Sequence, residues 1–90
     1  MAPSNVGLLL QIAVVAEGVG KPADALLALE RAVEIEPESP HHVGRLVALQ
    51  LRSGRYTDAA VTLSRALDRF PTDPELLRLA ERLRREVGIR

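Results

Sequence analysis

The sequence predicts an all-α fold, an α-α superhelix of five antiparallel helices, on three observations. Residues recur at a fixed spacing of 34 positions, and the recurring pairs include Gly20 and Gly54, Ala25 and Ala59, and Pro37 and Pro71. Apolar residues between them follow the helical period, and no stretch alternates as a strand would. The connections are short, which makes consecutive helices antiparallel neighbours. Such a repeat indicates an array whose units bury apolar faces against one another.

The first helix is expected from a cap at Ser4 or Asn5 to about Gly18, where Gly20 suits a left-handed C-cap. Its segment 6–16 is almost wholly apolar but shorter than the roughly 20 residues that cross a bilayer. Residues 1–5 contain no Lys or Arg, so the basic flank of a secretory signal is missing. We therefore expect a buried helix here, and a cytoplasmic protein.

Proline and glycine bound the remaining helices. The second is expected from Pro22 to Glu36, because Pro37 disfavours helical geometry in the residue before it. The third begins at Ser39-Pro40, a cap followed by a first-turn proline, and ends at Ser53-Gly54.

The fourth helix is expected from near Thr57 until Pro71 stops it. The fifth begins around Pro74 and ends at Gly88. Two residues can cap it: Thr72 has the capping-box spacing to Glu75, and Asp73 is an equally good N-cap.

These residues give the chain a resemblance to the tetratricopeptide repeat, whose 34-residue unit is a helix A–turn–helix B pair. The resemblance rests on the segments 20–37 and 54–71 and covers nearly the whole chain after residue 5. It divides the chain into repeat one, 6–39, repeat two, 40–73, and a lone helix A, 74–90. It implies a non-catalytic module that binds proteins, with Ala25 and Ala59 letting helices A and B approach closely.

The family's concave surface is lined mostly by helix A, and this mapping gives the candidate groove. Its residues are Leu10, Val14, Arg45, Leu51, Arg52, Arg78, Arg82 and Arg85. The last three share a helical face, and the arginines are suited to binding carboxylates of an acidic or C-terminal peptide. The alternative is a solvated outer face, with ordinary pairs between Glu81 and Arg85 and between Arg82 and Glu86.

The family's chaperone-tail clamp of Lys, Asn, Asn, Lys and Arg is absent. The corresponding positions are Leu10, Val14, Arg45, Glu75 and Leu79, so we do not expect chaperone-tail binding. The helix A positions also lack the family's usual aromatic and Leu-Gly residues.

The first helix is apolar on nearly all sides, whereas the terminal helix of an array needs a polar outer face. We expect a cover: another copy of the chain, more of a longer protein, or a ligand helix. Self-association would use Leu8, Leu10 and Val14. The alternative is that these are scattered exposed apolar residues, which are common.

Composition argues against other functions. The net charge is +0 and the only aromatic residues are Tyr56 and Phe70, so neither a basic field nor stacking platforms for nucleic acid are present. There is no cysteine, no catalytic grouping and no phosphate loop, and His41 and His42 diverge on a helix. We therefore expect no enzyme activity, cofactor or metal. Richness in Ala, Leu and Arg is typical of a bacterial chain.

Overall fold

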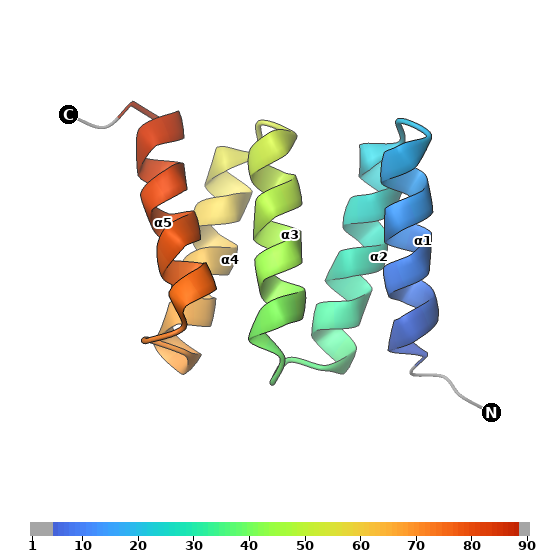
Figure 1. The fold of residues 1–90 in the computed structure, drawn as a ribbon, viewed down its shortest axis with the longest axis horizontal. Coiled ribbons are helices and arrows are strands. Elements are labelled where there is room, and N and C mark those ends of the chain that lie inside the picture. The colour runs from blue at the N-terminus through green and yellow to red at the C-terminus, as the bar shows by residue number, and fades with distance from the viewer. Residues whose placement is uncertain (1–4, 89–90) are drawn as a thin grey trace.

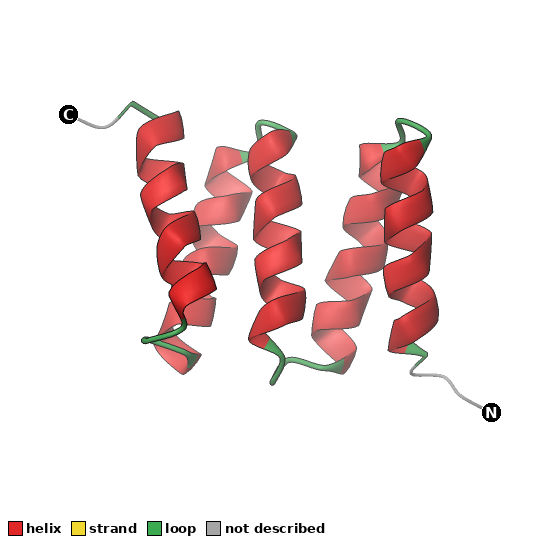
Figure 2. Ribbon diagram, viewed as in Figure 1, coloured by secondary structure: helices red, strands yellow, loops and turns green. Residues whose placement is uncertain are grey.

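The computed structural model describes residues 5–88, which form five helices and no strand (Figure 2). The helices are α1 (Val6–Gly18), α2 (Pro22–Ile35), α3 (Pro40–Arg52), α4 (Tyr56–Arg69) and α5 (Pro74–Glu86). They run antiparallel in sequence, with α1, α3 and α5 in one layer and α2 and α4 in the layer behind (Figure 1). The predicted all-α solenoid is confirmed.

The helix starts follow the predicted caps. The side chains of Asn5, Ser39 and Asp73 accept hydrogen bonds from the backbone N–H three residues later, which caps α1, α3 and α5. Asp73 is thus the cap of α5, and Thr72 is not. The alternative cap of α1, Ser4, lies outside the described residues.

The turns after α1 and α3 are closed by glycines at positive φ. Gly20 has a φ of 76° and Gly54 a φ of 73°. In each case the next residue donates its N–H back into the helix, from Lys21 to the carbonyl of Ala16 at 2.8 Å in the first turn. Because only glycine adopts this conformation without steric cost, the repeating glycines fix the repeating turns.

Two hydrophobic cores are joined through α3. Leu46 and Leu49 of α3 pack with α1 and α2, while Val43 and Val47 pack with α4 and α5. Alanines keep the helices close, as the sequence predicts. The fully buried ones are Ala13, Ala25, Ala32 and Ala59.

In the layer formed by α1, α3 and α5, the helices are unevenly spaced. Helix α3 packs on α5, whereas no Cα of α1 lies within 8 Å of a Cα of α3. At Gly44 a Cβ would lie 3.0 Å from Cδ of Glu75, so the missing side chain permits the approach of α5. The corresponding residue one repeat earlier is Leu10, which lines the space between α1 and α3. A hollow is left there.

Helix α1 is not buried as the sequence predicted. Only Val6, Ala13 and Ala16 are buried in it. Among its apolar residues, Leu8, Ile12, Val14 and Val15 are exposed. Within residues 5–88, α1 packs mainly on α2, which covers one side of the helix, so the cover expected for its other apolar side is not supplied by these residues.

Candidate functional site

The hollow between α1 and α3 is the part of the predicted groove that forms. Its volume is about 490 Å³, and it is lined by Leu10, Gln11, Val14 and Val15 of α1 and by Arg45 of α3. Three predicted groove residues, Leu10, Val14 and Arg45, therefore meet at one place. One wall is apolar, and the opposite wall carries a half-buried guanidinium.

Arg52 differs from the prediction, because it already has a carboxylate partner. Its guanidinium forms an ion pair with Glu17, which ties the C-terminal ends of α3 and α1 together. This contact links residues 35 positions apart, so no local pattern reveals it. Arg52 is thus paired within the chain, although half of its side chain stays exposed.

Leu51 also differs from the prediction. It is only 3% exposed and packs in the second core with Val47 and Leu63. The reason is helical geometry: Leu51 lies four residues after the fully buried Val47, so both side chains project from one face. Leu51 is a core residue and cannot contact a partner.

The three arginines of α5 lie apart from the hollow, on the far side of α3 from α1 (Figure 1). Arg78 and Arg85 are exposed and Arg82 is half-buried. Within residues 5–88 neither these three nor Arg45 forms an ion pair, so the pairs of the alternative interpretation, with Glu81 and Glu86, are not made. Of these four side chains, Arg78 and Arg85 are exposed to solvent and Arg45 and Arg82 are half-buried.

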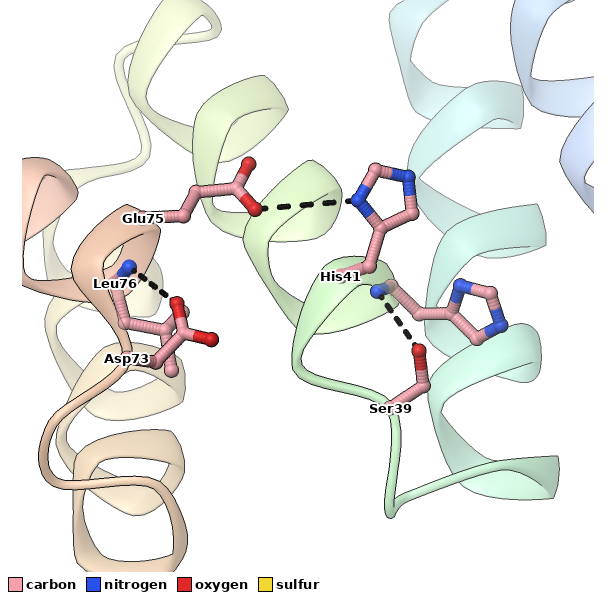
Figure 3. A network of polar contacts seen from close by, with 6 residues as sticks. Ser39, His41, Asp73, Glu75 and Leu76 are labelled. Carbon is pink, nitrogen blue, oxygen red and sulfur yellow. Dashed lines mark hydrogen bonds and ion pairs between the residues drawn. The ribbon is translucent and has the colours of Figure 1, made fainter.

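The two histidines point to different helices. Nδ1 of His41 lies 3.9 Å from Oε1 of Glu75 on α5, as Figure 3 shows, while Nε2 of His42 lies 2.9 Å from Oε1 of Glu36. Their ring centroids are 6.2 Å apart. They help to join α3 to its neighbours.

The residues predicted for self-association fall on two surfaces. Leu10 and Val14 line the hollow beside Arg45. Leu8 instead lies in a shallow depression with Ile12 and Val15 on the outer side of α1. The three predicted residues therefore do not form one contact face.

A second hollow, between α2 and α4, was missed by sequence reasoning. It has a volume of about 320 Å³, with Glu30 and Glu34 on one side, Arg65 and Arg69 on the other, and an apolar floor that includes Phe70. Arg69 also forms an ion pair with Glu38. The spacing of four within each pair is a signal of a shared helix face, but pairing α2 with α4 requires the fold.

The described part of the chain has no helix long and apolar enough to cross a membrane. Between residues 5 and 88, no group of three or more His, Asp or Glu side chains is placed to hold a metal ion.

Comparison with known families agrees with the fold. The family model described as tetratricopeptide repeat matches residues 16–83, which include α2, α3 and α4 in full and most of α5. Neither the curated proteins nor the solved structures contain a match to this sequence. Since the matched segment is well over half of the chain, the protein belongs to the tetratricopeptide repeat family.

Proposed function

We propose that the protein is an adaptor that binds a peptide or helix of a partner protein along the layer formed by α1, α3 and α5. Domains of this family generally mediate protein–protein interactions and are typically non-catalytic. The observation that carries the proposal is the hollow between α1 and α3, where an apolar wall faces Arg45.

The hollow suits an apolar side chain of the partner. Leu10 and Val14 supply apolar surface, and a buried aliphatic or aromatic side chain typically contributes about 1.5–3 kcal/mol when it leaves water. Arg45, which forms no ion pair within residues 5–88, is suited to a bidentate hydrogen-bonded pair with a nearby carboxylate.

The arginines of α5 extend the proposed preference for carboxylates along the layer of α1, α3 and α5. Packed helices lie about 8–10 Å apart and α1 is not packed on α3, so a ligand that reaches from α1 to Arg78 spans at least roughly 20 Å. An extended peptide covers that distance with about six residues. We therefore propose a ligand with an apolar anchor at one end and acidic residues toward α5, where Arg78, Arg82 and Arg85 lie.

Selection from a random peptide library on the purified protein tests this function. We expect selected peptides to pair an apolar residue with acidic residues, and Arg45→Glu or Arg78→Glu to weaken their binding at least tenfold, because a charge-assisted hydrogen bond is lost. Val14→Glu should weaken binding through the apolar anchor. Calorimetric titration supplies the affinities.

The matched control is Arg31→Glu, an exposed arginine on α2, in the other layer. It makes the same change in net charge, so it should leave the affinity within about twofold if the effect is local to the groove. Peptides selected without acidic residues, or an equal loss in all three arginine variants, would contradict the proposed groove.

A second candidate function is self-assembly through α1. It is favoured by the exposure of large apolar side chains along the outer side of this helix, which reaches 64% at Val15. Monomeric proteins rarely leave a continuous apolar patch in water unless it binds something. This surface does not include the guanidinium groups of the groove.

A further inference from the structure

The residues on the outer side of α1 have counterparts on α3 and α5, and those counterparts pack against the preceding helix. Ile12 and Val15 lie one repeat, 34 residues, before Leu46 and Leu49 of α3. Leu46 and Leu49 are buried in the first core, which α3 shares with α2. Ala80 and Leu83, one repeat later, pack against the core that α5 shares with α4. On α3 and α5, this side of the helix therefore packs against the preceding helix, which is α2 for α3 and α4 for α5.

On α1 these positions are apolar and uncovered by any part of residues 5–88. Leu8 is 51% exposed, Ile12 43%, Val15 64% and Val19 63%. Together they leave on the order of 400 Å² of apolar surface in water, as much as the largest patch of many monomers. None of the four is charged, and the charged residues of the same depression are Lys21 and Asp24 at its border with α2. Leu8, Ile12 and Val15 lie on α1 and Val19 is the residue directly after it, and we call these four residues the α1 seam.

The spacing of the residues in the α1 seam indicates that the segment that binds to it is a helix. The steps from Leu8 to Ile12, to Val15 and to Val19 are four, three and four residues, the alternation of a coiled-coil seam. Such side chains form a straight stripe that fits between the side chains of one facing helix. An extended strand has period two and does not match it.

We propose that the α1 seam binds the α1 seam of a second copy of the chain, antiparallel, across a two-fold axis. The proposal develops the second candidate function, and Val15 is the one residue that the α1 seam shares with the hollow between α1 and α3. A two-fold axis between Ala13 and Val14 sets Leu8 against Val19 of the second copy, and Ile12 against its Val15. Every contact is then apolar, and the two helices run antiparallel, as α2 and α3 do within the chain.

The other end of the array argues for this closed dimer over a filament. The side of α3 that packs on α4 contains Val43 and Val47, and one repeat later these positions are Leu77 and Glu81 of α5. Glu81 is exposed, so a head-to-tail contact would bury its charge, which is costly without a partner. The C-terminal end therefore combines a charge at Glu81 with the exposed Leu77, whereas the four residues of the α1 seam are all apolar.

The size of the contact sets its strength. Two seams would bury about 800 Å² of apolar surface, which is below the roughly 1,200 Å² of stable interfaces and is the size of a weak, transient one. We therefore expect a dimer that dissociates in the micromolar range. Light scattering behind size exclusion should give a mass that rises with concentration from 9.8 kDa toward twice that value.

A charge-swap experiment tests the partner and the register together. Ile12→Lys and Val15→Glu should each weaken the dimer at least tenfold, because each places a charge against an apolar side chain of the second copy. Mixing the two variants should restore association, since Lys at position 12 of one copy then faces Glu at position 15 of the other. Both positions are exposed in the monomer, so the helical circular dichroism should persist in each variant.

The control variant is Val14→Glu, which lies on the same helix but lines the groove. It should leave the dimer intact while weakening peptide binding, whereas Ile12→Lys should do the reverse, so each proposal can fail alone. A monomer throughout the micromolar range would overturn the second copy as the occupant and leave a helix of another protein. A dimer that survives Ile12→Lys, or mixed variants that stay monomeric, would overturn the antiparallel seam.

Discussion

Single glycines determine where the chain turns, and their backbone conformation makes this testable. Gly54 ends α3 at a φ of 73°, and a Cβ there would meet no heavy atom within 4 Å. We expect Gly54→Ala to lower the free energy of unfolding by about 1 kcal/mol, because an L-residue is strained in the left-handed region. The cost is purely conformational, since the added methyl group has space.

Gly18 provides the comparison, because it is the last residue of α1 and its Cβ would also meet nothing within 4 Å. Its φ is not positive, so Gly18→Ala should raise the free energy of unfolding by about 0.5 kcal/mol through helix propensity. Urea denaturation measures both variants. Equal effects of the two substitutions would show that φ does not decide the outcome.

Gln50 is the one buried polar side chain of α3, with 4% of its surface exposed. Its Oε1 atom has no hydrogen-bond partner among the described residues. Replacing it by leucine, which has a similar volume, should stabilise the fold by about 1 kcal/mol, because an unpaired buried acceptor is removed. Gln11→Leu, at an exposed position of α1, should change stability little. A loss of stability in Gln50→Leu, measured by thermal unfolding, would contradict this account.

At the scale of one element, α2 shows how a helix between two neighbours divides its side chains. Leu29 is fully buried in the first core, whereas Leu27 is 62% exposed two residues earlier. Leu29→Ala should therefore cost about 2–5 kcal/mol, from lost burial and an unfilled cavity. Leu27→Ala should cost under about 0.5 kcal/mol. Chemical denaturation of the pair checks the assignment, and similar losses would mean that α2 faces another way.

The helices could be predicted because their ends depend on nearby residues. Pro37 and Pro71 stop α2 and α4, and the fourth helix begins at Tyr56, one residue before the expected Thr57. Asp73 and Thr72 could not be separated by sequence, because both have cap chemistry. The carboxylate of Asp73 takes the role by reaching the N–H of Leu76 at 3.0 Å.

The candidate groove could be predicted only in part, because its shape depends on contacts between repeats. The meeting of Leu10 and Val14 with Arg45 follows from the repeat period. The pairing of Arg52 with Glu17 does not, since it depends on the distance between the ends of α1 and α3. Gly44, which permits the close approach of α5, has Leu10 as its counterpart one repeat earlier, so the two repeats differ at this position.

At the scale of the whole molecule, α3 connects two cores, whereas α1 belongs to the first core alone and packs mainly on α2. Opening α3 exposes side chains of both cores, including Leu49 in the first and Val47 in the second. Opening α1 exposes side chains of the first core alone. Because each unit of a solenoid is stabilised by its neighbours, local stability should fall from α3 toward the ends.

Hydrogen exchange measures this gradient directly. In dilute solution we expect the amides of α3 to exchange most slowly, through opening of both cores, and those of α1 and α5 to exchange faster. As the concentration passes through the dimer range, protection should rise in α1 and stay constant in α5, because only α1 gains a neighbour. The Ile12→Lys variant should abolish that rise. Uniform protection along the chain would show one cooperative unit, and equal concentration dependence in α1 and α5 would indicate head-to-tail association.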